Sequence, residues 1–492
     1  MRTKYIDLID QTFDFPQNEF NLREDRLFFH GIDLMRLIQE YGTPLKFNYL
    51  PQISNNIQRA KGWFREAINN QGYAGKYYYS YCTKSSHFAF VLDEVMKNDV
   101  HIETSSAFDI DIVNNLVDSG KLKEGTFVIC NGFKPARYVE RIAKLINADF
   151  LKVVPVVDNA EEVRNLLAST DKDLSIGIRI AAEEEPKFEF YTSRLGMRYR
   201  EIVPFYKSVL KDNPRIKVKM LHFFINTGIN DTAYYWNELT KCLRIYSDLK
   251  KLCPELDSLN IGGGFPIKKS LAFDFDYAYM VREILQQIKR VCTDNDIPEP
   301  NIFTEFGSYT VGESGAVLYE IIDQKLQNDK ELWYMIDGSF ITQLPDSWGM
   351  NQKYIMLPVN NWGIPYQKVN LGGLTCDSMD FYNTEAHSSD LYLPIFEENS
   401  ERQYVGFFHT GAYQESLGGY GGIQHCLIPA PKHVIVDRLE DGTITTRLFS
   451  EEQLSGPMLT ILGYNQTQEA PLNAVIEIES PEMVKTEKLA SV

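Results

Sequence analysis

Short runs of apolar and β-branched residues recur at regular intervals between about residues 76 and 307. Each run is apolar on both of its alternating faces, which is typical of parallel strands that are covered on both sides. Between the runs, apolar positions return every three or four residues, as in helices that bury one face. The predicted strands are Lys76–Lys84, His101–Ser105, Phe127–Gly132, Val153–Asp158, Ile176–Ile180, Val218–Phe224, Leu259–Gly264 and Ile302–Gly307. The predicted helices are Phe88–Lys97, Asp109–Ser119, Tyr138–Ile146, Ala160–Leu167 and Tyr277–Cys292.

Eight strands in series with intervening helices predict a closed (β/α)8 barrel of the TIM type, and a doubly wound open sheet is the alternative. The last third of the chain has a different pattern, in which short strand-like runs alternate with turns rich in Gly, Pro and Asn. This pattern predicts an antiparallel β domain. Its clearest runs are Gln403–His409, His433–Val436 and Thr443–Phe449. We therefore expect an α/β plus all-β protein with a barrel at residues 45–315, a C-terminal β domain at 316–492 and an N-terminal segment, 1–44, that packs with the β domain.

Composition and charge narrow the classes of partner. A chain of 492 residues is long enough for two sizeable domains. The net charge of −17 repels phosphate backbones and anionic membranes, so neither nucleic acid nor a membrane is expected as a partner. No apolar stretch has the length of a membrane span. The first 15 residues lack an apolar signal, and the seven cysteines and eight histidines form no metal-binding motif. A reduced cytoplasmic compartment and no metal site are the expectations.

Candidate chemistry lies where the predicted strands end, because barrel enzymes place reactive groups at that edge. Lys84 ends the first strand, where a partly buried lysine can act as a nucleophile. Gly262–Gly264 follow the seventh strand and leave backbone N–H groups open to an anion. Glu305 and Gly307 end the eighth, where a carboxylate can bind a protonated ring nitrogen. Taken singly, Lys84 could be a solvated lysine, Gly262–Gly264 a tight turn and Glu305 a salt-bridged glutamate. Together, the three would face the same mouth of the barrel.

Cys376 and Asp377 lie in a Gly- and Ser-containing stretch, Gly372–Ser378, outside the predicted barrel. Such a composition is typical of a loop that reaches a site, and a thiol there can donate a proton. A buried structural cysteine is the alternative interpretation of Cys376.

These motifs resemble those of the barrel-type, alanine-racemase-like pyridoxal 5'-phosphate (PLP) decarboxylases, which act on ornithine, arginine or diaminopimelate. The resemblance covers nearly the whole chain from Tyr41–Leu45 onward and includes the turn Ser193–Gly196. It implies that Lys84 holds PLP covalently and that Cys376 donates a proton in the neighbouring subunit, which requires at least a homodimer. The cofactor-binding residues that it implies are Lys84, Arg179, Phe224, Thr227, Gly262, Gly263, Gly264, Glu305, Gly307 and Tyr413.

The chain departs from the family pattern at two points. After the sixth strand the family has His-x-His-x-Gly-Ser, whereas this chain has Phe224 at the second histidine and Thr227 at the serine. A phenylalanine can still stack on a ring, and a threonine can still donate to phosphate. After the eighth strand, Ser308 replaces an arginine that contacts the phosphate in the family.

Two longer stretches, Gln343–Gly349 and Gly411–Gly418, resemble biosynthetic arginine decarboxylases. The resemblance implies conversion of L-arginine to agmatine and CO2 in polyamine synthesis, with magnesium as a further cofactor of some relatives. Asp346 and Asp377 are the candidate carboxylates for the cationic tail of the substrate. Ornithine, lysine or diaminopimelate decarboxylation are the alternatives, followed by an amino-acid racemase and a non-catalytic regulatory homologue.

Overall fold

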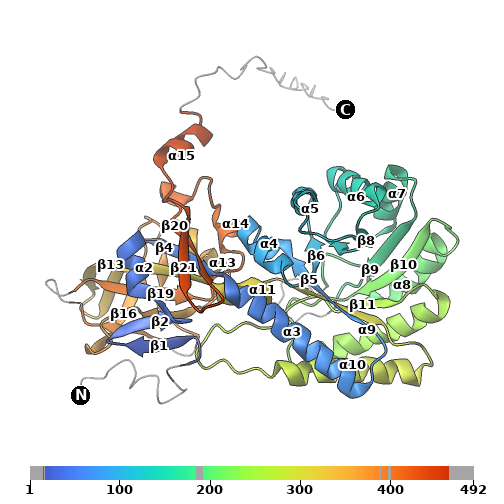
Figure 1. Cartoon of the computed structure of the whole chain (residues 1–492), viewed down its shortest axis with the longest axis horizontal. Coiled ribbons are helices and arrows are strands. Elements are labelled where there is room, and N and C mark those ends of the chain that lie inside the picture. Colours follow the sequence, from blue (N-terminus) through green and yellow to red (C-terminus); the bar gives the residue numbers. More distant parts are fainter. Residues whose placement is uncertain (1–14, 16, 184–191, 387–388, 397–400, 465–492) are drawn as a thin grey trace, which may run out of the picture.

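The computed structural model describes residues 15, 17–183, 192–386, 389–396 and 401–464. Parts of the predicted N-terminal segment and of the predicted C-terminal domain lie outside these residues. In Figure 1 a helix-covered barrel lies beside a body built mainly of strands. The chain passes from the strand-rich body into the barrel through helix α3 (Leu50–Gln71).

Eight parallel strands form the barrel in the order of the sequence. The last strand, β12, pairs with the first, β5, through partners such as Phe303 and Tyr78, so the sheet closes. This closure confirms the predicted (β/α)8 barrel and rules out the doubly wound open sheet. The strands are β5 (Tyr77–Cys82), β6 (His101–Thr104), β7 (Phe127–Cys130), β8 (Lys152–Val157), β9 (Leu174–Arg179), β10 (Ile216–His222), β11 (Ser258–Asn260) and β12 (Asn301–Phe306).

All five predicted helices are present, and each has ends within two residues of the predicted ones. Polar caps set several of the starts; Ser106, for example, caps α5 with its side chain while Asp109 bonds back to the Ser106 backbone. The barrel helices are α3, α4 (Ala89–Met96), α5 (Ala107–Asp118), α6 (Ala136–Ala148), α7 (Ala160–Ser169), α8 (Tyr199–Phe205), α9 (Ala233–Leu252) and α10 (Tyr277–Asp294), and the short α11 (Ser308–Val311) follows β12.

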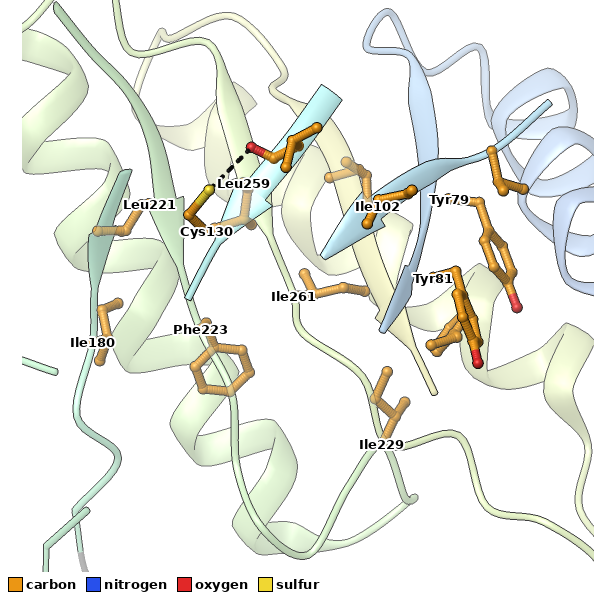
Figure 2. Packing of buried hydrophobic residues seen from close by; sticks show 14 of the residues in the cluster. Tyr79, Tyr81, Ile102, Cys130, Ile180, Leu221, Phe223, Ile229, Leu259 and Ile261 are labelled. Atoms are coloured by element: carbon orange, nitrogen blue, oxygen red, sulfur yellow. Dashed lines mark hydrogen bonds between the residues drawn. The ribbon is translucent and has the colours of Figure 1, made fainter. Parts of the chain in front are cut away.

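The strands bury side chains on both faces, as their apolar pattern predicts. Val128 and Cys130 of β7 face outward into the large cluster between strands and helices. Ile129, between them, joins a smaller cluster inside the barrel with residues such as Met220 and Phe303. Figure 2 shows part of the outer cluster, in which Cys130 is labelled. This alternation fixes which side chains point into the barrel.

The second body is a mostly antiparallel sheet, as expected, but two of its strand pairs are parallel. β4 (Leu45–Tyr49) pairs in parallel with β20 (Lys432–Arg438), and β14 (Glu331–Ile336) with β16 (Tyr366–Gly372). The strands of each parallel pair are joined by long connections, because a tight hairpin cannot link parallel neighbours. The other strands are β13 (Gly315–Gln327), β15 (Ile355–Pro358), β17 (Phe381–Tyr382), β18 (Leu391–Pro394), β19 (Gln403–Phe408) and β21 (Ile444–Ser450).

The N-terminal residues that the structure describes pack against this sheet. Phe20 and Phe29 share one buried cluster with Leu318 of β13, Phe408 of β19 and Val434 of β20. The domain limits at residues 44 and 315 remain predictions, and β4 lies in the sheet although the first limit assigns it to the barrel. The remaining elements are β1 (Phe20–Arg23), β2 (Arg26–Phe29), β3 (Ile32–Asp33), α2 (Leu34–Tyr41), α12 (Phe340–Gln343), α13 (Pro345–Gly349), α14 (Gln414–Gly418) and α15 (Ser455–Ile461).

Candidate active site

A layer of polar side chains follows the apolar interior at the carboxyl ends of the barrel strands. A residue two positions after an inward-facing residue also points inward, because side chains alternate along a strand. Three residues of the interior cluster are each followed two positions later by a buried polar residue, at Asn131, His222 and Glu305. Asn260, at the end of β11, joins them. The fold thus gathers amides, an imidazole and a carboxylate at one mouth.

Glu305 is the centre of this layer and is buried. Its Oε2 accepts hydrogen bonds from Asn131 Nδ2 at 2.9 Å and His222 Nε2 at 3.0 Å, and its Oε1 accepts one from Asn260 Nδ2 at 2.6 Å. Burial alone would raise the pKa of Glu305, but the charge and hydrogen bond of His222 and the bond from Asn131 outweigh it and lower the pKa to about 2. Glu305 is therefore an ionised acceptor at neutral pH.

Lys84 lies in a short turn, Thr83–Ser85, directly after β5, and its side chain is exposed at the mouth. The nearby Glu103 carboxylate raises the pKa of Lys84 and outweighs the loss of water around the amine inside the cavity, which acts in the opposite direction. Glu103, at the end of β6, accepts hydrogen bonds on Oε1 from Asn131 Nδ2 and Ser105 Oγ, both at 3.1 Å. Its Oε2 is buried and has no hydrogen-bond partner among the described residues. Asn131 therefore links the two carboxylates beside Lys84.

A cavity of about 450 Å³ opens over this layer. It brings together nine of the ten predicted cofactor-binding residues, all except Gly262. Gly262 lies just below, where its carbonyl accepts the backbone N–H of Glu305 at 2.8 Å. The predicted residues that line the cavity are Lys84, Arg179, Phe224, Thr227, Gly263, Gly264, Glu305, Gly307 and Tyr413.

Arg179 and Phe224 form one wall of the cavity. The guanidinium carbon of Arg179 lies 5.8 Å from the centre of the Phe224 ring, within the range of a cation–π contact. The Nε atom of Arg179 is buried without a hydrogen-bond partner among the described residues. The wall therefore offers a flat aromatic face beside a fixed positive charge.

Tyr413 reaches the cavity from the strand-rich body of the same chain. Its backbone N–H donates to the carbonyl of Ser85 at 2.8 Å, which ties this segment to the turn that holds Lys84. Tyr413 has a φ of 69°, an unusual left-handed conformation for a side chain of this size. Burial raises the pKa of its hydroxyl, so the hydroxyl remains a hydrogen-bond donor at neutral pH.

A glycine-rich bend also lines the cavity. A Cβ atom on Gly263 would overlap the carbonyl oxygen of Glu305, and Gly264 has a φ of 104°. The Gly264 carbonyl accepts the N–H of Ile229 at 2.8 Å, which joins the bend to the loop after β10. Residues without a side chain are therefore required at these positions. The absence of side chains also allows a phosphate to approach the backbone N–H groups closely.

Replacement of Gly263 with alanine is expected to lower the free energy of unfolding by about 1–3 kcal/mol, because the backbone must move away from Glu305. Gly62, in the middle of α3, is a matched control because nothing lies within 4 Å of a Cβ placed there. Gly62→Ala should leave stability unchanged or raise it by up to about 1 kcal/mol. Urea unfolding of both variants checks this; equal midpoints would contradict the described geometry.

Cys376 and Asp377 do not line the cavity that the described residues of their own chain form. Cys376 is exposed, with its sulfur 3.5 Å from the sulfur of Cys426. Asp377 Oδ2 lies 3.6 Å from His425 Nε2. Their roles in proton donation and substrate binding remain predictions.

Asp346 also lies outside the cavity lining, but next to it. It is buried in α13, and its Oδ2 accepts a hydrogen bond from Gln414 Nε2 at 2.8 Å. Burial raises the pKa of Asp346, while Gln414 and the charge of Lys269, a cavity residue, act against that rise. Its other oxygen, Oδ1, is buried with no hydrogen-bond partner among the described residues. Its contact with a substrate tail therefore remains a prediction.

Comparison with known proteins identifies the group to which this site belongs. The model of the pyridoxal-binding domain of pyridoxal-dependent decarboxylases matches residues 56–312, more than half of the chain. The chain belongs to this decarboxylase family. A biosynthetic arginine decarboxylase of Prochlorococcus marinus (strain AS9601) is 21% identical over an alignment of 585 positions, gaps included, which covers 93% of this chain and 88% of that protein.

Two solved structures share the whole fold. The biosynthetic arginine decarboxylase of Campylobacter jejuni has a TM-score of 0.78 at 17% identity and covers 93% of this chain and 92% of its own. The diaminopimelate decarboxylase of M. jannaschii has a TM-score of 0.75 at 18% identity and covers 90% of this chain and 97% of its own. At this level of identity, the two structures establish the barrel and β domain as a common architecture.

The cavity fits the cofactor of the decarboxylase family. PLP has an aldehyde, a ring nitrogen and a phosphate, and the cavity offers an amine at Lys84, an ionised carboxylate at Glu305 and bare backbone at Gly263. In the described part of the chain, no group of three or more His, Cys, Asp or Glu side chains is placed to hold a metal ion. None of the described helices combines the length and apolar character of a membrane span.

Proposed function

We propose that this family member is a decarboxylase of L-arginine that releases agmatine and CO2. The observation that carries the chemistry is the ionised Glu305 carboxylate, held by three donors at the same mouth as the Lys84 amine. The choice of arginine is supported by the stretches Gln343–Gly349 and Gly411–Gly418 and by the arginine decarboxylases among the relatives. Ornithine, lysine and diaminopimelate are the alternative substrates within the same chemistry.

Bound PLP supplies an electron-accepting ring that stabilises the carbanion left by loss of CO2. Lys84 would hold the cofactor aldehyde, and Glu305 would keep a proton on the ring nitrogen because its own pKa is too low to take that proton. The backbone around Gly263 and Gly264 and the Tyr413 hydroxyl would bind the phosphate. Phe224 would cover one face of the ring and exclude water from it.

Glu103 would orient the Lys84 amine, since its carboxylate stabilises the charged form of that side chain. Asn131 donates one hydrogen bond to the Glu103 carboxylate and one to the Glu305 carboxylate. These bonds fix the orientation of both carboxylates. The arrangement therefore separates a carboxylate that serves the lysine from one that serves the cofactor.

The substrate side of the proposal involves a second subunit. We propose a homodimer in which Cys376 of one subunit donates the proton that replaces CO2 in the other, with Asp346 and Asp377 near the substrate tail. We also propose a cytoplasmic role in polyamine synthesis, in keeping with seven free cysteines. The family resemblance also implies magnesium as a further cofactor.

Mixing two inactive variants tests the shared site. Lys84→Ala and Cys376→Ala should each be inactive, and a mixed dimer should contain one site with both native residues. Random reassortment of equal amounts makes half of the dimers mixed, so CO2 release should recover to about a quarter of the wild-type rate. No recovery, with mass spectrometry showing mixed dimers, would place both residues in the same chain's site.

The direct test is incubation of PLP-loaded protein with L-arginine, followed by mass analysis of the product. We expect one agmatine for each CO2 released. If the cofactor is bound and the arginine is still unchanged after a long incubation with the enzyme, arginine is not the substrate.

A further inference from the structure

Two loops of the strand-rich body bring Cys376 and Cys426 together, although 50 residues separate them in the sequence. Their sulfur atoms are 3.5 Å apart. The structure describes all seven cysteines, and these two are exposed whereas the other five are buried. The exposed thiols are therefore also the ones that lie in contact.

The first loop is held by a buried carboxylate. Asp380 Oδ2 accepts hydrogen bonds from the Thr375 backbone N–H at 3.1 Å and the Thr375 hydroxyl at 2.7 Å. The Met379 N–H donates to Asp377 Oδ1 at 2.8 Å. Cys376 lies between these anchored residues, so its position is set by the loop.

The second loop is held by two glutamines. Gln424 Nε2 donates to the Gly418 carbonyl at 3.1 Å, and Gln453 Nε2 donates to the Gly422 carbonyl at 2.8 Å. Cys426 itself has a φ of 53°, which turns the backbone sharply at this point. The loops also meet through His425 and Asp377, the residues adjacent to the two cysteines.

We propose that Cys376 and Cys426 are a redox-modification site at which a peroxide forms an intrachain disulfide, and that this disulfide stops decarboxylation. The inhibitory part rests on the proposed function, in which Cys376 donates the proton. A disulfide needs a sulfur–sulfur distance of about 2.05 Å, so the sulfurs must approach by only about 1.5 Å. Anchored loops and a short approach favour this bond over separate oxidation of each thiol.

The chemistry balances with hydrogen peroxide as the oxidant. One sulfur attacks an oxygen of the peroxide, an S–O bond forms, the O–O bond breaks, and the sulfenic acid and one water result. The second sulfur then displaces the hydroxyl group, which leaves as a second water while the S–S bond forms. The two sulfurs lose two electrons in all, and the peroxide gains them. A thiol reductant reverses the reaction by exchange.

In the reduced protein, the hydrogen bond and the electrostatic interaction with Cys426 raise the pKa of Cys376. Cys376 keeps its proton at neutral pH with or without this neighbour, because the ordinary thiol value of 9.0 already lies above neutral pH. The disulfide removes this proton and the thiol together, and that is the physical reason for the expected loss of activity.

The test is titration of the PLP-loaded, reduced enzyme with hydrogen peroxide, with peptide mapping by mass spectrometry and CO2 release followed in parallel. Activity is measured with whichever of arginine, ornithine, lysine and diaminopimelate the reduced enzyme uses. We expect a peptide in which Cys376 is linked to Cys426, a fall in CO2 release of at least about tenfold, and recovery with dithiothreitol.

Cys426→Ser and Cys426→Ala are the matched variants. Both should decarboxylate at close to the wild-type rate in reductant. With excess peroxide, Cys376 in them has no partner and should pass to the sulfinic acid, so dithiothreitol should no longer restore activity. Full recovery in these variants would show that oxidised Cys376 returns to the thiol without Cys426, which would contradict the proposed disulfide.

The peptide map of the wild-type protein shows whether the disulfide forms, and it needs no variant. Separate oxidation of the two cysteines, or a link between Cys376 residues of two subunits, would overturn the proposed bond. The intrachain link with unchanged CO2 release would overturn the inhibition. If the reduced enzyme uses none of the four amino acids, the proposed function fails, and the peptide map still decides whether the disulfide forms.

Discussion

Replacement of Lys84 with alanine is expected to lower CO2 release at least about a thousandfold and to abolish the visible absorbance of covalently bound cofactor. Lys84 is the amine that lies at the cavity mouth beside Glu103, on the turn directly after the first barrel strand. The side chain is exposed to the cavity, so its loss leaves no hole in the core. The folded state should therefore survive, and circular dichroism should match that of the wild type.

Lys144→Ala is the control for general loss of a positive charge. Lys144 lies on the exposed face of α6, where it pairs with Glu140 four residues earlier. Surface pairs of this kind contribute little to stability, so this variant should keep its cofactor and its activity. Turnover of Lys84→Ala within tenfold of the wild type would remove Lys84 from the chemistry.

Replacement of Glu305 with glutamine is expected to lower kcat by about 100- to 1,000-fold while PLP remains bound. A neutral amide cannot hold a proton on the ring nitrogen, so the ring becomes a weaker acceptor of electrons. The amide also places an NH2 group where one oxygen accepts hydrogen bonds, either opposite Asn260 at Oε1 or opposite Asn131 and His222 at Oε2. At least one polar group is then left unpaired in a buried place, at a cost of about 1–3 kcal/mol of stability.

The stability difference between wild type and Glu305→Gln should depend on pH with a defined sign. The pKa of Glu305 is lowered in the folded state, so its contribution is fully present above the ordinary value of 4.5 and is lost as the pH falls toward about 2. Chemical unfolding from pH 7 to pH 3 measures this, with exposed Glu140→Gln as the control. A difference that grows as the pH falls would contradict the ionised state of Glu305.

The sequence predicts the barrel well because eight strands that are apolar on both faces leave few other folds. Lys84 and Glu305 could be found because each ends such a strand. Glu103, Asn131, His222 and Asn260 were missed, although each lies within a predicted strand. The signal that could have found them is the alternation of side chains along a strand, because Asn131 and His222 lie two positions after an inward-facing residue. The inward-facing side of each strand can be identified only once the barrel is known to close.

Two further features could not be derived from local pattern. The parallel pairing of β4 with β20 joins segments from opposite ends of the chain, so no turn signal predicts it. Cys426 lies near Cys376 because loops anchored at Asp380 and Gln424 meet, and neither loop has a periodic pattern. The sequence indicates which residues carry chemistry on each strand; the closed fold decides which of them meet.

We expect this family member to decarboxylate arginine in preference to other basic amino acids. The most direct measurement is competition: PLP-loaded protein is given equal concentrations of L-arginine, L-ornithine, L-lysine and isotope-labelled meso-diaminopimelate, and the four products are quantified by mass. The label distinguishes lysine formed from diaminopimelate from the lysine supplied. We predict that agmatine forms at least about tenfold faster than any other product, a preference of about 1.4 kcal/mol in kcat/KM. Predominant formation of putrescine, cadaverine or lysine would contradict the assignment of arginine, while the chemistry of Lys84 and Glu305 would stand.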